Sequence, residues 1–252
     1  GVLSSANLTF DGTISTMGFD GCIFVGIAGQ GTIILPATLN CTRRFRIIYS
    51  AVVAFGGATG IQADAAATIP VESFIFDTVA FSGGATYVSG IARDDDRSLW
   101  VNNTGIINTA TTGVMTMQGN ATATTVSAIN TEYVAAGTTL LDTTVTQKFS
   151  MPQSMRLTYD GAIDRQFRCT AMLTLTSGNN NQIGVYWGKN GTPIANSEMY
   201  ATMDGNGRRE NMAIQAIVEL SDGDYMEVFV ENATGASNIT INDLNAVIEA
   251  LN

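Results

Sequence analysis

The densest group of chemically active side chains is Asp94-Asp95-Asp96, which Arg93 and Arg97 flank. Hard cations such as Ca²⁺ bind several oxygens, and adjacent carboxylates in a loop can supply them. The run lacks the Asp-x-Asp-x-Asp-Gly order of a calcium-binding loop, and the two arginines would already neutralise much of its charge. We therefore predict a solvated turn here, with no bound metal and no other cofactor.

Hydrolysis of a glycosidic bond is the second chemistry that the carboxylates suggest, since it requires two of them about 5 to 9.5 Å apart. Asp77, Asp94, Asp96 and Glu132 would share one flank of a solenoid, but nothing in their spacing demands a site, and surface carboxylates are usually solvated. The chain has no histidine, which excludes Ser-His-Asp and Cys-His catalysis. We predict that the protein is not an enzyme and assign no catalytic residue.

Two polar loops are the best candidates for recognition, Ser177 to Gln182 and Asp204 to Arg209. Amide side chains give adaptable hydrogen bonds to sugars or to protein loops. Tight turns require the same residues, so a purely structural role stays open. The predicted binding residues are Asn179, Asn180, Asn181, Asp204, Asn206, Arg208 and Arg209.

The charge balance narrows the partners, because the 252 residues carry a net charge of −10. An acidic surface repels phosphate backbones, so we expect no nucleic acid. The one local exception is Arg43-Arg44-Phe45-Arg46, which we interpret as a solvated strand face. No apolar run approaches the ~20 residues of a membrane-spanning helix, so we expect no membrane insertion.

The three cysteines, Cys22, Cys41 and Cys169, are too few and too widely spaced for a disulfide framework. Cys169 lies in an apolar strand and is predicted to be a small buried residue. Whether Cys22 and Cys41 pair stays open.

Period-2 alternation and polar turns dominate the chain, and no long segment has a 3.6-residue period, so we predict an all-β protein. The clearest example is the C-terminal stretch, in which apolar residues alternate from Met212 to Leu220 and again from Tyr225 to Glu231. Ser221 to Asp224 form a tight turn between these runs, which predicts a β-hairpin. Some eight short strands after residue 148 suit an antiparallel jelly-roll sandwich.

The N-terminal half shows a weak internal repeat. Six-residue blocks with apolar ends begin at Ile48, Phe76, Val101 and Ile129, so successive starts differ by 28, 25 and 28 positions. A period of this size, built from short strands, predicts a β-solenoid-like body, and an ordinary sandwich is the alternative. We predict a lead-in segment at 1–20, a solenoid-like domain at 21–147 and a jelly-roll domain at 148–252.

The C-terminal part, from Phe149 to Leu251, resembles a recurrent module of tail-fibre and other virion surface proteins of bacteriophages, marine ones especially. The residues behind this resemblance are Phe149-Ser150-Met151-Pro152, Arg156-Leu157-Thr158-Tyr159, Ser177 to Gly184, Lys189-Asn190-Gly191, Val218-Glu219-Leu220 and Gly223 to Asn232. The leucine–turn–Gly-Asp–strand arrangement also resembles the late hairpin of trimeric tumour-necrosis-factor-like and C1q-like jelly rolls.

This resemblance implies a homotrimer on the virion exterior, in a fibre, spike or head appendage. Its partners would be other virion proteins and a host surface glycan or protein. Capsid decoration and polysaccharide depolymerisation are the alternatives. The residues also favour association, because the apolar blocks are too numerous for one thin solenoid to hide, and a threefold axis would cover strand edges. A monomer with a thick sandwich is the other possibility.

Overall fold

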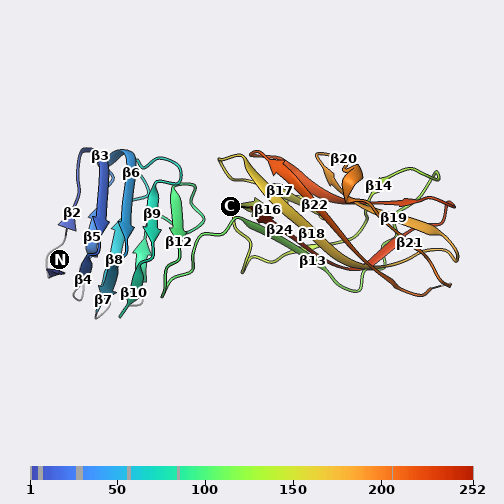
Figure 1. Ribbon diagram of the computed structural model, residues 1–252, viewed down its shortest axis with the longest axis horizontal. Coiled ribbons are helices and arrows are strands. Elements are labelled where there is room, and N and C mark those ends of the chain that lie inside the picture. Colours follow the sequence, from blue (N-terminus) through green and yellow to red (C-terminus); the bar gives the residue numbers. More distant parts are fainter. Residues whose placement is uncertain are drawn as a thin grey trace. The chain divides into compact units, whose positions relative to one another are not determined.

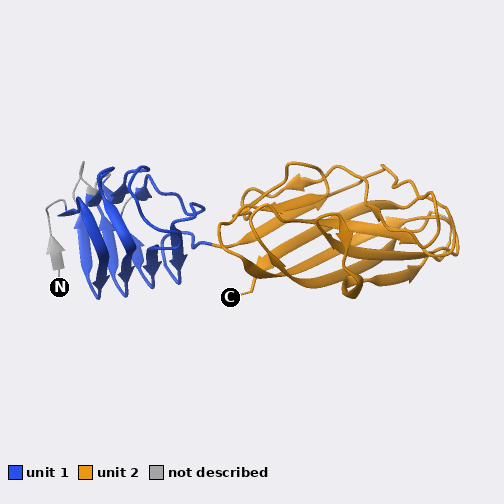
Figure 2. Ribbon diagram, turned by 90° about the horizontal axis from the view of Figure 1, so that it is seen from above, with its two compact units in different colours: residues 1–109 blue, residues 110–252 orange. Residues whose placement is uncertain are grey.

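The computed structural model describes residues 2–4, 8–26, 31–55, 58–83, 86–205 and 207–251. Within these ranges the chain is all-β apart from a 3-10 turn, η1 (Ala195–Ser197), as the sequence predicts (Figure 1). No helix there has the length and apolar character to cross a membrane. The chain divides into two compact units, residues 1–109 and 110–252, each with its own hydrophobic core (Figure 2).

The first unit is a parallel β-solenoid of four rungs, which confirms the solenoid prediction over the sandwich. Its strands are β1 (Val2–Ser4), β2 (Leu8–Thr9), β3 (Thr13–Asp20), β4 (Ile23–Gly26), β5 (Gly31–Leu35), β6 (Asn40–Ile48), β7 (Ala51–Ala54), β8 (Thr59–Ala63), β9 (Phe74–Asp77), β10 (Ala80–Ser82), β11 (Thr86–Ser89) and β12 (Ser98–Val101). Each rung gives one strand to each of three sheets, in the orders β1-β4-β7-β10, β2-β5-β8-β11 and β3-β6-β9-β12. The rungs pair in parallel throughout.

One corner of the solenoid explains the repeat. Gly21, Tyr49, Thr78 and Asn102 follow the strands of the third sheet, and all have positive φ, at 62°, 45°, 54° and 55°. The first three each donate a backbone N–H to a carbonyl of the next rung, over 3.1 to 3.2 Å. The chain therefore turns through the same unusual backbone conformation once per rung, whatever residue stands there.

Aromatic rings fill much of the solenoid interior. Phe45 of β6 lies opposite Phe74 of β9, with ring centres 5.5 Å apart. Phe74 and Phe76 are 4.8 Å apart, and Phe76 and Trp100 are 5.4 Å apart. Pairs at these separations add about 0.5–1.5 kcal/mol each to the free energy gained by burying apolar area.

The second unit is an antiparallel sandwich with the predicted jelly-roll character. Its strands are β13 (Thr112–Met117), β14 (Tyr133–Val134), β15 (Leu140–Leu141), β16 (Phe149–Ser150), β17 (Arg156–Tyr159), β18 (Arg165–Thr176), β19 (Gln182–Lys189), β20 (Thr192–Pro193), β21 (Met199–Thr202), β22 (Glu210–Leu220), β23 (Tyr225–Asn232) and β24 (Thr240–Ala250). One sheet has the order β15-β13-β24-β18-β22. The other has the order β16-β17-β23-β19-β20, with β14 on β23 and β21 on β19.

The predicted β22–β23 hairpin is wrong in its pairing, although both strands and the turn are present. Gly223 has φ 82° in that turn, and Asp224 donates its N–H to the Ser221 carbonyl over 2.9 Å. However, β22 pairs with β18, whereas β23 pairs with β14, β17 and β19. The turn therefore crosses from one sheet to the other, which lets both apolar faces pack on the same core.

The boundary between the units differs from the predicted one near residue 147. β3 pairs with β6 along its length, so the predicted lead-in is part of the solenoid. β13 pairs with β24 from Thr112 to Met117, which brings residues 110–147 into the sandwich. The block that begins at Ile129 leads into β14, an antiparallel partner of β23, so it is not a solenoid rung.

Candidate functional site

The two predicted recognition loops lie side by side, because β19 and β21 pair with Gln182 opposite Thr202. Beyond that pair, Asn180 donates its N–H to the Met203 carbonyl over 2.9 Å, and Met203 donates its own to the Asn181 carbonyl over 2.8 Å. Asn180 takes the left-handed conformation with φ 58°, which asparagine tolerates. The sequence predicted the two loops but not that they are neighbours. The pairing of β19 with β21 brings them together into one surface.

The side chains of these loops divide into exposed and structural ones. Asn179, Asn180, Asp204 and Arg208 are exposed, and Arg208 Nη1 lies 3.9 Å from Asp204 Oδ2. Asn181 is buried against Gly178, where an added Cβ would lie 2.6 Å from its Nδ2. Asn181 therefore packs within the turn, and the binding role predicted for it stays a prediction. Asn206 lies outside the described residues.

Arg209 turns away from the loops and binds Asp243 of β24. Its Nη1 donates to Asp243 Oδ2 over 2.9 Å, and that carboxylate also accepts from Thr174 Oγ1 over 2.8 Å and from the Gly119 N–H over 2.9 Å. The Gly119 and Thr174 hydrogen bonds lower the pKa of Asp243, and the Arg209 charge adds to this. The Arg209 side chain stays 55% exposed in this ion pair, so its predicted binding role stays a prediction.

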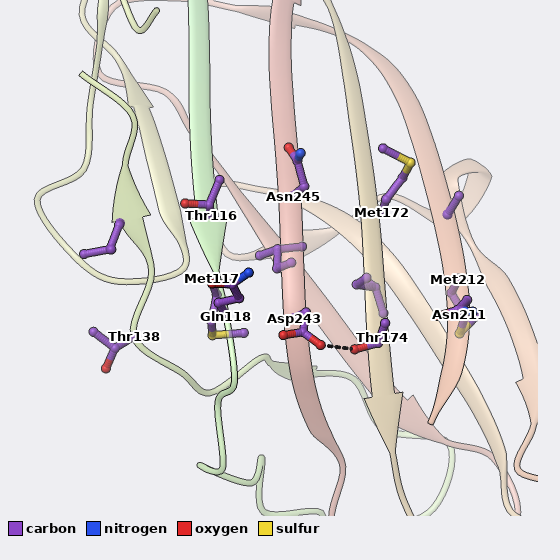
Figure 3. A pocket seen from close by; sticks show the side chains of 14 residues that line it. Thr116, Met117, Gln118, Thr138, Met172, Thr174, Asn211, Met212, Asp243 and Asn245 are labelled. Atoms are coloured by element: carbon purple, nitrogen blue, oxygen red, sulfur yellow. Dashed lines mark hydrogen bonds between the residues drawn. The ribbon is translucent and has the colours of Figure 1, made fainter. Parts of the chain in front are cut away.

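Asp243 and Thr174 also line a groove, which lies on the outer face of the β15-β13-β24-β18-β22 sheet (Figure 3). The groove has a volume of about 1010 Å³. One cross-strand row forms its floor, in the order Leu140, Thr116, Asn245, Met172 and Ala213. Neither a carboxylate nor a basic side chain belongs to this row, so the floor offers apolar contact and neutral hydrogen bonds, and Asp243 is the one carboxylate among the lining residues.

A second polar cluster, which the sequence did not reveal, lies on the outer face of the other sheet. Tyr186 donates to Glu198 over 3.2 Å, its hydroxyl lies 2.9 Å from that of Tyr200, and Tyr200 donates to the buried Glu231. Gly184 makes room for it, because an added Cβ would lie 2.8 Å from Glu231 and from Tyr200. A glycine inside a strand often marks such a close approach, and this was the available signal.

The carboxylates considered for catalysis are divided between the two units, and several of them have structural partners. Asp95 receives the Arg97 guanidinium in two hydrogen bonds, over 2.7 and 2.8 Å, and Arg97 Nη1 also binds the carbonyls of Ala65 and Ala67. The flanking Arg97 thus neutralises one carboxylate of the acidic run, that of Asp95. Asp77 binds Thr78 and Asn102 at a rung corner, whereas Glu132 belongs to the other unit. In the described ranges, His, Cys, Asp and Glu form no group able to hold a metal ion.

The cysteines are free thiols. Cys169 is fully buried, as predicted, and this burial raises its pKa to about 12. Burial also raises the pKa of Cys41. Both thiols therefore resist ionisation, which makes them poor nucleophiles.

No protein-family model matches the chain, and no curated protein matches its sequence. A crystal structure of murine APRIL at pH 5.0 is similar in fold, with 8% identity and a TM-score of 0.39, and the match covers 55% of this chain and 98% of that one. A crystal structure of rabbit GITRL has 12% identity and a TM-score of 0.31 over 56% of this chain and 94% of that one. Both are jelly rolls of the tumour-necrosis-factor type. Similarity at this level indicates neither a function nor an oligomeric state for this chain.

Proposed function

We propose that the protein is a non-enzymatic, homotrimeric structural protein of a bacteriophage virion surface, displayed as a fibre, spike or head appendage, and that it contributes to host attachment. The virion setting follows from the resemblance of Phe149 to Leu251 to phage surface modules. A parallel solenoid joined to a jelly-roll sandwich in one chain is compatible with it.

The observation that supports assembly most directly is the outer face of the five-stranded sheet. Leu140, Met172 and Ile217 are 69%, 59% and 62% exposed there, although one face of a sheet in a monomer is normally polar. Two ion pairs lie on this face, Arg168 with Glu249 over 3.2 Å and Arg209 with Asp243 over 2.9 Å, and Glu219 of β22 adds one exposed carboxylate. The face is thus close to neutral in a chain of charge −10, so a second copy meets little repulsion there.

Association through this face requires roughly 800 Å² from each partner. Light scattering after size exclusion should give three times the chain mass of 26.5 kDa. Met172→Glu with Ile217→Glu should dissociate the assembly, because each copy would bring like charges into an apolar contact. Met199→Glu is the matched control, since Met199 is 51% exposed on β21 of the other sheet and its replacement should leave the mass unchanged. A monomeric wild-type chain at micromolar concentration would refute the trimer.

Attachment requires its own test. Labelled protein should stay on host cells after washing, and antibody–gold labelling should place it on the particle exterior. Retention that is weak for a monomer and strong for the trimer would fit several copies acting together. Labelling over the capsid lattice without cell retention would show a decoration protein instead.

A further inference from the structure

A groove with basic side chains lies on the first unit, and none of its lining residues was predicted to bind. Arg43, Arg44 and Arg46 of β6 and Thr16 of β3 line it, and its volume is about 520 Å³. All four side chains are exposed, which confirms the predicted solvated face for the arginines. Two local features of β3 and β6 place these three cations together.

A register shift between β3 and β6 brings Arg43 to the surface together with Arg44 and Arg46. Ile14 of β3 lies opposite Cys41, whereas Thr16 lies opposite Arg44, so β6 has one residue more than β3 over this stretch. Cys41 and Phe45 are buried, so strict alternation would point Arg43 into the core. The extra residue leaves Arg43 and Arg44 both exposed, and such bulges commonly re-aim side chains next to functional sites.

Gly18 of β3 leaves room for the side chain of Arg46, which lines the groove. Gly18 lies opposite Arg46, and an added Cβ there would lie 3.0 Å from Arg46 Nε and 3.4 Å from its Cγ. The arginine stem therefore lies along the neighbouring strand across a position without a side chain. Packing of the stem restricts the guanidinium and lowers the entropy that it loses on binding a ligand.

The charge of these arginines is uncompensated within the described part of the chain, where no ion pair joins any of the three to a carboxylate. Residues 1–109 contain five arginines and no lysine, so this groove holds most of the positive charge of the unit. Asp20 and Asp77 lie opposite Ile48, two residues beyond Arg46, and they limit the basic surface on that side. Guanidinium groups stay charged at any physiological pH and match oxyanions with two parallel hydrogen bonds.

We infer that this groove binds an acidic polysaccharide, whose carboxylate or sulfate groups contact Arg43, Arg44 and Arg46. The inference rests on the proposed attachment function and names its ligand class. Charges set along a strand, with about 6.6 Å between Arg44 and Arg46, suit anions repeated along a polymer better than one small ion. Single-stranded nucleic acid also repeats its charge, but it usually requires aromatic rings for base stacking, and the groove lining has none.

The test uses the full chain and immobilised polymers: polygalacturonate with carboxylates alone, dextran sulfate with sulfates alone, neutral dextran, and single-stranded DNA. Wild type should bind at least one acidic polysaccharide more tightly than DNA and should not bind dextran. Arg44→Gln with Arg46→Gln should weaken that binding about tenfold, since each exposed contact to an anion is worth about threefold. The preferred polymer identifies the anion as carboxylate or sulfate.

Arg93→Gln with Lys148→Gln is the charge-matched control, because it removes two positive charges outside the groove and outside the predicted binding residues and should change affinity less than twofold. Gly18→Val keeps every charge but displaces Arg46, and it should weaken binding about threefold. Equal losses in the groove and control variants, or tighter binding to DNA, would overturn the inference, and so would no binding to either acidic polysaccharide.

The polysaccharide-binding test and the host-attachment test can fail independently of each other. If the wild type and the groove variant stay on host cells equally well, attachment stands and the groove has no part in it. If the wild type binds an acidic polysaccharide but not the host, the groove stands and the attachment function fails.

Discussion

Arg156 donates from its Nη2 to the carboxylate of Glu227 over 2.9 Å, directly across the β17–β23 pair. Glu227 is 1% exposed and Arg156 is 26% exposed, so the carboxylate is the more deeply buried partner. The guanidinium carbon also lies 3.8 Å from the centre of the Tyr225 ring. A charge as deep as that of Glu227 is tolerated only while it is paired, which makes the second unit depend on Arg156.

We predict that Arg156→Leu lowers the free energy of unfolding of the second unit by about 3 kcal/mol, because it leaves a buried carboxylate without its cation. Each unit contains one buried tryptophan, Trp100 in the first and Trp187 in the second. Urea unfolding in a Trp100→Phe background therefore follows the second unit alone, through the fluorescence of Trp187.

Two variants make this measurement specific. Arg156→Leu with Glu227→Leu should recover most of the loss, because it removes the buried charge as well. Arg168→Leu breaks the half-exposed pair with Glu249 and should cost less than about 1 kcal/mol. If Arg156→Leu costs no more than Arg168→Leu, the pair is not what holds Glu227 in place.

In the first unit, Asn103 links one rung to the next. Its Oδ1 accepts the Val79 N–H and its Nδ2 donates to the Phe76 carbonyl, both over 2.9 Å, and the side chain is buried. Asn103→Ala should cost roughly 2 kcal/mol, because it leaves two buried backbone groups unpaired. The measurement is urea unfolding of a Trp187→Phe background through Trp100. Thr104→Ala, at the exposed next position, should stay within about 0.5 kcal/mol of wild type, and an equal effect of both would contradict this role.

The hydroxyls of Tyr186 and Tyr200 should resist ionisation. Burial raises the pKa of both, and the neighbouring carboxylate of Glu231 raises both further. Since both folded pKa values exceed the ordinary 10, the stability they add is complete below pH 10 and is lost as the pH rises beyond it. In a titration followed at 295 nm, Tyr49→Phe should remove one ordinary step, because Tyr49 is exposed, and Tyr186→Phe should remove none. A step lost near pH 10 in Tyr186→Phe would refute the raised pKa.

The solenoid was predictable because its tight turns and its apolar residues recur at a nearly constant spacing in the sequence. Ile48, Asp77 and Val101 stack in register, which gives steps of 29 and 24 positions, close to the 28 and 25 counted from the block starts. The block at Ile129 shows the limit of this reasoning. Apolar ends with polar residues between them suit any short strand pair, so only the partner strand, β23, shows that this block belongs to the sandwich.

The loops were predictable from turn chemistry, whereas the roles of their side chains were not. Asn179 and Asn181 have the same type and nearly the same neighbours, yet one is exposed and the other is packed under Gly178. The alternation in β23 likewise does not predict that Glu227 and Glu231 are buried, which depends on close neighbours in β19 such as Gly184 beside Glu231. These outcomes depend on cross-strand neighbours that one sequence does not specify.

The turn between β22 and β23 should make the second unit sensitive to acid. Asp224 lies 2.8 Å from Lys189 Nζ and accepts from Asn190 Nδ2 over 2.6 Å and from the Ser221 N–H over 2.9 Å. Burial opposes ionisation of Asp224, but these partners outweigh it and lower its pKa from 3.8 to about 2. Because the folded pKa is the lower one, this contribution is complete above pH 3.8 and is lost as the pH falls towards 2.

We therefore expect the free energy of unfolding of the second unit, followed through Trp187 in the Trp100→Phe background, to fall by about 1–2 kcal/mol between pH 5 and pH 2 on account of Asp224. Asp224→Asn should remove that part of the pH dependence and be less stable than wild type at pH 5, since it keeps the shape but loses the charge that Lys189 binds. Asp222→Asn changes an exposed carboxylate of the same turn and should keep the wild-type slope. If Asp224→Asn and wild type lose stability in parallel down to pH 2, the acid sensitivity of this unit has another origin.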